Sequence, residues 1–393
     1  MELRFSLIFL VLIQFYSISL VGQKSLTENA TISLYTCGSG DEVHTKFGHS
    51  GIRVKDPAQN LDIIFNYGIF DFDDPNFLIN FLKGKLLYQL GIQRNTSFIQ
   101  NYKDEKRTVY EQVFDLTQEE KTAFYDFLVE NYKPENRKYS YDFFADNCSS
   151  RIRDIFDIKT PSIHYPEKLF DRTYRDMLDE HLTKSPWMDF GIDLILGAIA
   201  DDSTSLEEQF FLPLYMFDYL DKTFLNNKPL VKKTDIVIDF IEVRANQKVS
   251  FFTPKLLFGI LLLIEILLLI FHYVYPKKSW KIARGYDYFV FLAMGIGGLI
   301  LAFMWWGTEH IPTKENWNLL WMNPLFLIIV SLYHKRETQG YKVIATLLII
   351  INIIIMSGVF PIPQRFHTAS YLVMATLTVK LIRTIVIKRM DKA

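Results

Sequence analysis

Two residues of the sequence have the types that nucleophilic catalysis needs. Cys148 lies in the segment Asp146-Asn-Cys-Ser-Ser-Arg, which has the pattern of the first turn of a helix. A helix N-terminus favours the thiolate form of a cysteine, and a nearby histidine does the same. His49, in the segment Phe47-Gly-His-Ser, is the natural base for such a thiol. The sequence therefore predicts nucleophilic catalysis, with Cys148 and His49 as the catalytic residues.

Other interpretations of these residues stay open at the level of sequence. Cys37 is the second of the two cysteines, and in an exported protein it could form a disulfide with Cys148. A zinc site built from His, Cys and Asp is also open, but the chain has neither an HExxH motif nor paired CxxC motifs, and we expect no metal. We expect no cofactor either, because the chain has no glycine-rich phosphate loop.

The residue that would orient His49 is harder to identify. Asn66 lies on the strand predicted to follow that of His49 and is the first candidate. Asn147 and Arg151 are close to Cys148 in the sequence and are further supporting candidates. For each of the three, a structural role is the default interpretation.

Short strands can be predicted next to His49. The segments 52–54 and 63–67 indicate two short strands, joined by a turn between Asp56-Pro57 and Asn60. With the helices expected further along, they predict an α+β domain. We assign this domain to residues 24–253, which are enough to bury a core of their own.

Helix starts can be predicted further along the same domain. Thr117 and Glu120 have the spacing of a capping box, and Asn147 precedes the predicted helix of Cys148. The apolar segment 190–200 is too short to span a bilayer. It predicts either a core helix or a helix that lies at a surface.

The composition changes on both sides of this domain. Residues 1–22 contain Arg4, an apolar run and then small residues, which is typical of a secretory signal peptide. After Pro254 the chain becomes apolar and basic residues outnumber acidic ones, whereas the part before it is acidic. The net charge of −1 over 393 residues, without a long Lys/Arg block in the first part, argues against nucleic-acid binding.

Residues 254–393 predict an all-α membrane domain of about five transmembrane helices. Its apolar stretches are close to the ~20 residues that cross about 30 Å of hydrocarbon. Asn323-Pro324 interrupts the third stretch. The predicted spans are 256–275, 286–306, 319–333, 343–360 and 369–387.

Charged residues indicate the orientation of these spans. Most Lys and Arg residues after Pro254 fall in the first and third loops and at the C-terminus, and we expect Lys380 and Arg383 to snorkel toward the same side. The positive-inside rule makes that side cytoplasmic, so the N-terminal domain lies outside. Glu265 falls within the first span, where a charge is costly, and is either a functional residue or a helix-pairing one.

A wider pattern surrounds the catalytic candidates. Its segments are Thr36-Cys-Gly-Ser-Gly-Asp, Phe47-Gly-His-Ser, Phe65-Asn-Tyr-Gly, Tyr139-Ser-Tyr-Asp, Asp146-Asn-Cys-Ser-Ser-Arg, Phe211-Leu-Pro, His310 and Asn316-Trp-Asn-Leu-Leu-Trp-Met-Asn-Pro. This pattern resembles the Lnb family of bacterial lipoprotein N-acyltransferases over nearly all of the chain after the signal peptide. More distantly, a histidine on a strand followed by a cysteine at a helix start resembles the permuted papain-like fold of the NlpC/P60 and lecithin:retinol acyltransferase group.

The resemblance implies an activity and its partners. An acyl chain would move from a phospholipid to the α-amino group of the diacylglyceryl-cysteine of a diacylated lipoprotein, through a thioester on Cys148. The protein would lie in the bacterial inner membrane, with its N-terminal domain in the periplasm and its C-terminus in the cytoplasm. His310 and Asn316 would lie in an outer loop and are expected as supporting residues.

Two other classes of function share part of this pattern. A membrane-anchored, papain-like cysteine amidase or peptidase acting on cell-wall peptide would use Cys148 and His49 but would not need five spans. A non-enzymatic membrane scaffold would need only a disulfide between Cys37 and Cys148.

Overall fold

The computed structural model describes residues 25–70, 77–85, 87–160 and 162–386. The predicted signal peptide, 1–22, lies outside the described residues. Contacts within the chain divide it into two compact units. The first consists of Met1–Phe81, Lys85–Asp171 and Thr204–Asn246, and the second of Leu82–Gly84, Arg172–Ser203 and Gln247–Ala393.

The first unit is built on an antiparallel sheet of seven strands in the order β10-β5-β1-β2-β3-β4-β6. The strands are β1 (Thr31–Cys37), β2 (His49–Asp56), β3 (Leu61–Phe70), β4 (Leu87–Arg94), β5 (Val109–Phe114), β6 (Lys138–Ser140) and β10 (Val231–Ile238). A small sheet contains β7 (Ile163–His164), β8 (Phe224–Leu225) and β9 (Lys228–Pro229). The two strands predicted from 52–54 and 63–67 are confirmed as parts of β2 and β3.

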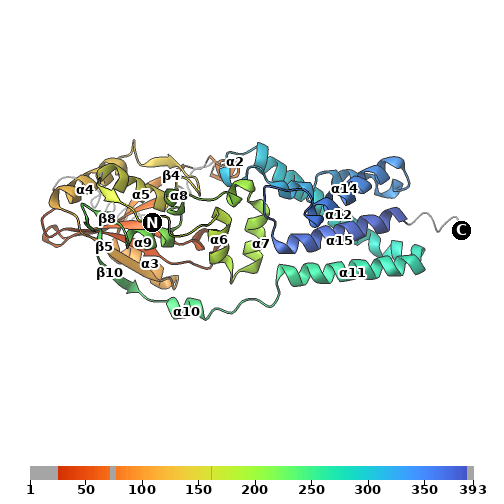
Figure 1. Cartoon of the computed structure of the whole chain (residues 1–393), viewed down its shortest axis with the longest axis horizontal. Coiled ribbons are helices and arrows are strands. Elements are labelled where there is room, and N and C mark those ends of the chain that lie inside the picture. Colours follow the sequence, from red (N-terminus) through yellow and green to blue (C-terminus); the bar gives the residue numbers. More distant parts are fainter. Residues whose placement is uncertain (1–24, 71–76, 86, 161, 387–393) are drawn as a thin grey trace, which may run out of the picture. The chain divides into compact units, whose positions relative to one another are not determined.

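Helices cover both faces of the large sheet. Phe65 of β3 contacts Tyr125 of α4 (Gln118–Tyr132), whereas the next residue back, Ile64, packs with Phe98 of α3 (Asn95–Asp104). Because successive strand residues point to opposite faces, α4 and α3 lie on opposite sides of the sheet (Figure 1). Helix α5 (Cys148–Lys159) packs on β2 and β3 and against α4. The other helices of this part of the chain are η1 (Val43–Thr45), η2 (Pro57–Gln59), α2 (Phe77–Lys83), α8 (Leu206–Gln209), α9 (Pro213–Leu220) and α10 (Ile241–Ala245).

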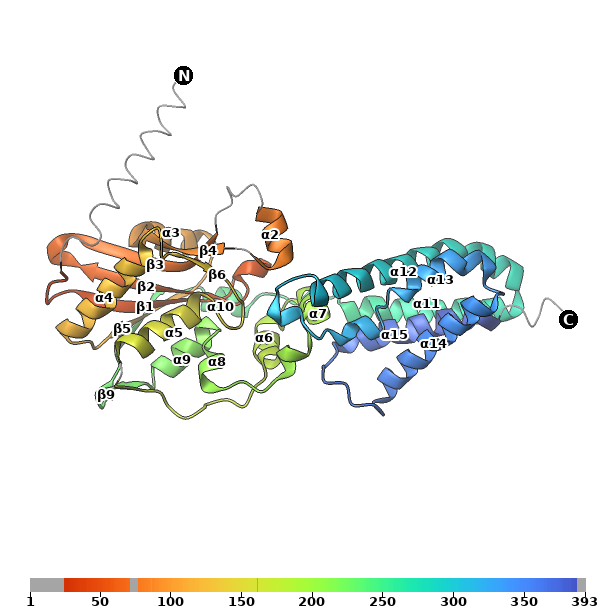
Figure 2. The same ribbon diagram turned by 90° about the horizontal axis from the view of Figure 1, so that it is seen from above.

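The second unit is helical. Its elements are α6 (Tyr174–Leu182), α7 (Pro186–Ile195), η3 (Ala198–Asp201), α11 (Pro254–Val274), α12 (Pro276–Trp306), η4 (Ile311–Thr313), η5 (Trp317–Leu320), α13 (Leu325–Leu332), η6 (Tyr333–Lys335), α14 (Gln339–Ser357) and α15 (Thr368–Val386), most of which are visible in Figure 2. Among the described residues, α11, α12, α14 and α15 are long and apolar enough to cross a membrane. Four of the five predicted spans therefore coincide with such helices.

The exception is the third predicted span, 319–333, which is a broken helix. Its chain runs beside α12 in the opposite direction, since Cβ atoms on Gly298 and Gly295 would lie 2.5 Å from Met322 O and 2.6 Å from Leu327. Pro324 stands at the break, and helix α13 begins after it. Non-helical backbone can lie at membrane depth when protein covers it, and the glycines of α12 provide that close cover.

Four charged side chains meet inside the helical bundle. Glu265 of α11 and Asp287 of α12 form ion pairs with Lys380 and Arg383 of α15, at 2.6–2.8 Å. All four side chains are fully buried. The expectation that Lys380 and Arg383 snorkel to the membrane surface is therefore wrong, because two carboxylates pair with them within the bundle. The ion pairs of Glu265 link α11 to α15, as the helix-pairing interpretation expects.

Candidate active site

Cys148 is the first residue of α5, and the sequence before it fixes that helix start. The side chain of Asn147 accepts hydrogen bonds from the N–H groups of Ser149 and Ser150, at 2.8 and 3.0 Å. The Ser150 hydroxyl completes a capping box by accepting from the Asn147 N–H. Cys148 is 9% exposed. Its thiol thus lies where the positive end of the helix dipole favours a thiolate.

His49 is held at the start of β2 by the turn from β1. In this turn Gly48 has φ = +84°, and a Cβ at this position would lie 2.7 Å from the carbonyl oxygen of Cys37. A side chain at position 48 would therefore be strained both by its backbone angle and by a clash. This requirement explains the glycine in Phe47-Gly-His.

Asn66 of β3 orients the imidazole. Its Oδ1 lies 2.5 Å from His49 Nε2. An amide oxygen only accepts hydrogen bonds, so Nε2 is protonated and its N–H donates a hydrogen bond to Oδ1. His49 also forms a hydrogen bond with the Cys148 sulfur. Because Nε2 is bonded to Asn66, we assign this second bond to Nδ1. The structure thus brings together the three residues Cys148, His49 and Asn66, which come from α5, β2 and β3.

Cys148 and His49 each shift the pKa of the other toward its charged form. Burial raises the pKa of Cys148, but His49, together with hydrogen bonds from the Ser50 N–H and the Ser149 hydroxyl, outweighs burial and lowers this pKa below the usual thiol range. Burial lowers the pKa of His49, but the Cys148 thiolate and the bond to Asn66 outweigh it and raise this pKa above its usual value. Both shifts favour a thiolate–imidazolium pair.

Three residues of the quoted motifs, for which the sequence indicated no individual role, complete the site. Gly68 has φ = +88°, and a Cβ there would lie 3.9 Å from Cys148 Cβ and 4.0 Å from His49 Cε1. It follows Asn66 at an irregularity in the pairing of β3 with β4, and such bulges re-aim side chains. Ser50 and Ser149 share a buried hydrogen bond of 2.8 Å, which ties β2 to the first turn of α5.

The segment Phe211-Leu-Pro connects the two halves of the site. The Phe211 carbonyl accepts a hydrogen bond of 2.9 Å from Asn147 Nδ2. Pro213 lies against Gly48, 3.4 Å from where a Cβ on that glycine would be. One short segment therefore contacts both the cysteine motif and the histidine motif, which explains its place in the sequence pattern.

Comparison with known families gives two matches. Residues 23–180 match the model of the Lnb N-terminal periplasmic domain, and residues 246–391 match that of the Lnb transmembrane domain. The chain belongs to the Lnb family. Neither the search of curated proteins nor the search of solved structures gave a match to this chain. The first match contains Cys148, His49 and Asn66, and the second contains the membrane helices.

Cys37 of this Lnb-family chain does not pair with Cys148. Both cysteines are free thiols, so the disulfide considered from the sequence is wrong. Burial raises the pKa of Cys37 to about 12, which keeps this thiol protonated. It lies on β1 opposite His49 of β2 and packs in the cluster that contains Phe98 and Tyr102.

The two supporting candidates near Cys148, Asn147 and Arg151, form hydrogen bonds and ion pairs with neighbouring residues. Asn147 uses its whole amide, since Oδ1 caps α5 and Nδ2 donates to the carbonyls of Phe143 and Phe211. Arg151 forms a two-pronged ion pair with Asp146, and its guanidinium lies over the ring of Tyr139. Both residues shape the start of α5.

His310 and Asn316 belong to the second compact unit. Asn316 is fully buried and donates to the Leu194 carbonyl at 2.9 Å, while its Oδ1 accepts from the Asn318 N–H. His310 precedes η4 and lies against Gly84, where a Cβ would be 2.7 Å from the His310 nitrogen. Both residues lie in the segment between α12 and α13 and attach it to other parts of this unit, Asn316 to Leu194 and His310 to Gly84.

Proposed function

We propose that this protein is a lipoprotein N-acyltransferase, which moves an acyl chain from a phospholipid to the α-amino group of the diacylglyceryl-cysteine of a lipoprotein. The observation that carries the proposal is the hydrogen-bonded series Asn66–His49–Cys148, in a domain joined to membrane helices of the Lnb family. Family membership indicates a membrane enzyme that modifies lipoproteins. The thiolate and imidazolium supply a nucleophile and an acid for acyl transfer.

In the first step the Cys148 thiolate attacks the carbonyl carbon of the phospholipid ester. A carbon–sulfur bond forms and the ester carbon–oxygen bond breaks, which leaves an acyl thioester on Cys148 and a lysophospholipid. The imidazolium of His49 gives its Nδ1 proton to the departing alkoxide oxygen. Asn66 keeps the ring in the orientation that this transfer needs.

In the second step the lipoprotein amine attacks the thioester. A carbon–nitrogen bond forms and the carbon–sulfur bond breaks. His49, now neutral, accepts the proton that the amine loses. The products are an N-acylated lipoprotein and the original thiolate–imidazolium pair, so the two steps should show ping-pong kinetics.

One backbone donor of α5 is suited to the oxyanion. The N–H groups of Ser149 and Ser150 bond to Asn147 Oδ1, so the Cys148 N–H is the donor of this turn that remains for the substrate. A single donor of this kind typically contributes about 2.7–4 kcal/mol to transition-state stabilisation. We assign the oxyanion to this group.

The topology and ancestry form part of the same proposal. We infer that the thiol domain faces the periplasm and the C-terminus the cytoplasm, with the broken segment around α13 as the remaining crossing. This arrangement puts the loops rich in Lys and Arg on the cytoplasmic side. The position of His49 on a strand, before a helix that begins at Cys148, supports a permuted papain-like fold for this domain.

The experiment is to trap the thioester. Purified protein in detergent is incubated with a phospholipid and no acceptor, and its intact mass and hydroxylamine sensitivity are measured. We expect one acyl group on Cys148, released by hydroxylamine, and none in Cys148→Ser.

Cys37→Ser is the matched control and should acylate normally. Acylation that persists in Cys148→Ser, or that disappears in a folded Cys37→Ser, would contradict the assignment of the nucleophile. Cleavage of cell-wall peptide without any acyl adduct would favour the amidase.

A further inference from the structure

Helix α7 of the second unit turns acidic residues toward the protein and exposes apolar ones, which is the opposite of the arrangement expected for a helix in water. Asp189 and Asp193, one turn apart, face the protein, and Asp193 is only 7% exposed. Trp187, Gly191 and Ile195, also at intervals of one turn, are the exposed positions. A helix in water buries its apolar face, so this inversion indicates an apolar environment outside α7.

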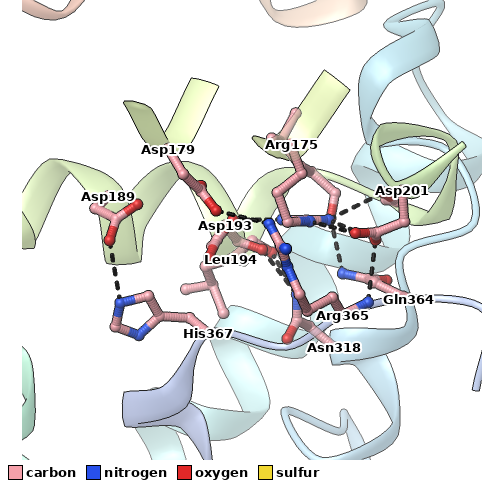
Figure 3. A network of polar contacts seen from close by, with 12 residues as sticks. Arg175, Asp179, Asp189, Asp193, Leu194, Asp201, Asn318, Gln364, Arg365 and His367 are labelled. Atoms are coloured by element: carbon pink, nitrogen blue, oxygen red, sulfur yellow. Dashed lines mark hydrogen bonds and ion pairs between the residues drawn. The ribbon is translucent and has the colours of Figure 1, made fainter. Parts of the chain in front are cut away.

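The inward carboxylates have protein partners, as Figure 3 shows. Asp193 forms an ion pair with Arg175 of α6, and Asp189 pairs with His367 Nε2 at 3.4 Å. Arg175 also bonds to Asp201 at 2.8 Å. Both carboxylates of α7 therefore have a charged partner within the protein, from α6 and from the segment before α15, although Asp189 Oδ1 has no hydrogen-bond partner among the described residues.

The N-terminal part of α7 lies beside the first turns of α11, a candidate membrane span. Trp187 Nε1 donates to the Phe252 carbonyl at 2.8 Å, and the two rings are 5.6 Å apart. Phe190 contacts Phe258 of α11, with ring centroids 5.2 Å apart. Since α11 begins at Pro254, these contacts hold α7 at the level where the chain enters the membrane.

The exposed surface is continuous with that of the span. Phe251 and Phe252 are 88% and 51% exposed immediately before α11, and outward residues of α11 such as Leu263 are apolar and exposed as well. A Cβ on Gly191 would meet nothing within 4 Å, so the middle of the outer face of α7 is open.

We propose that α7 is an interfacial helix. Its outer face, formed by Trp187, Gly191 and Ile195, contacts phospholipids at the boundary between headgroups and acyl chains, in the leaflet that α11 enters first. Tryptophan prefers this level of a bilayer because its ring is apolar and its N–H is polar. A short helix with one apolar face binds there without crossing. The inference does not depend on the acyltransferase proposal.

The test is fluorescence quenching by brominated lipids. Gly191→Cys is made in a Cys148→Ser background, labelled with a small thiol-reactive fluorophore, and reconstituted in phosphatidylcholine vesicles. The lipids carry bromine either near the headgroup end or near the methyl end of the acyl chain. Leu263→Cys, within α11, and Asp202→Cys, an exposed polar position, are the comparison sites.

We expect strong quenching at position 191 by bromine near the headgroups and weaker quenching by bromine near the methyl end. Position 263 should respond more to the deeper bromine, and position 202 to neither. Ile195→Cys, on the same face one turn further, should repeat the result for position 191. Quenching at 191 and 195 no greater than at 202, or strongest from the deeper bromine, would overturn the proposal.

Discussion

Cys148 and Cys37 are both buried, yet their surroundings act on the two thiols in opposite directions. His49 and two hydrogen bonds lower the pKa of Cys148 despite its burial. Cys37 lies in an apolar cluster, where burial raises the pKa of its thiol to about 12. Because of the nearby histidine and the helix start, we expect only Cys148 of the two thiols to be reactive.

This difference predicts how fast each thiol is alkylated at different pH. The Cys148 thiolate is the reacting form, and since its pKa is lowered, the rate with iodoacetamide should reach its plateau below the usual thiol pKa of about 8.5. His49→Ala should move the midpoint upward and slow alkylation at pH 7 by about tenfold or more. The measurement is mass spectrometry of the modified peptides over time.

Cys37 provides the internal control, because a buried protonated thiol should stay unmodified in the native protein. An unchanged midpoint in His49→Ala would show that the histidine does not stabilise the thiolate.

Asn66 should act through His49 and not on the substrate. Asn66→Ala removes the acceptor for Nε2–H, and we expect kcat to fall about 10- to 100-fold with little change in KM. Asn66→Asp keeps an acceptor and should restore part of the rate. Gln93→Ala, which removes the other partner of the Asn66 amide, should have a small effect. A rise in KM alone in Asn66→Ala would point to substrate binding instead.

At the scale of elements, the site depends on where strands and helices begin. The capping box of Thr117 and Glu120, the turn at Asp56 to Asn60 and the helix start at Asn147 were all predictable, since each follows from local hydrogen bonding. The meeting of Cys148 with His49 was not, because it requires α5 to pack across β2 and β3. The irregularity at Gly68 depends in turn on the pairing of β3 with β4.

Gly68 allows a test of this local geometry. Its φ of +88° is costly for any other residue, and Gly68→Ala should lower the free energy of unfolding by about 1–3 kcal/mol. It should also slow Cys148 alkylation, because a backbone shift that relieves this φ would occur beside Cys148 and His49, which lie 3.9 and 4.0 Å from the Cβ position. Both are measurable by thermal melting and by peptide alkylation.

Gly38→Ala is the matched control. Its Cβ would make only ordinary contacts, the nearest at 3.6 Å, and its φ is not positive. Equal effects of the two substitutions would refute the special role of position 68.

At the scale of the whole molecule, hydropathy predicted the apolar membrane helices but not the contacts between them. Lys380 and Arg383 lie near the end of the last span, which favoured snorkelling from sequence alone. Their pairing with Glu265 and Asp287 depends on the packing of α11 and α12 against α15. Similarly, the third span is broken because its chain packs against the glycines of α12.

The four-charge cluster predicts a coupling between substitutions. Glu265→Leu leaves a buried positive charge in excess, and we expect it to destabilise the bundle by about 3–5 kcal/mol. The double substitution Glu265→Leu with Lys380→Met restores neutrality and should recover much of the loss. Thermal stability in detergent checks both. A double variant less stable than the single one would contradict pairing as the role of Glu265.

The most direct test of the central claim is mass spectrometry of lipoprotein N-terminal peptides from cells whose only N-acylating enzyme is this protein. Wild-type cells should yield N-acylated diacylglyceryl-cysteine, and cells with Cys148→Ser at equal abundance should yield a free α-amino group. A free amino group in both strains, or an N-acyl group in both, would contradict the claim that this protein acylates lipoproteins through Cys148.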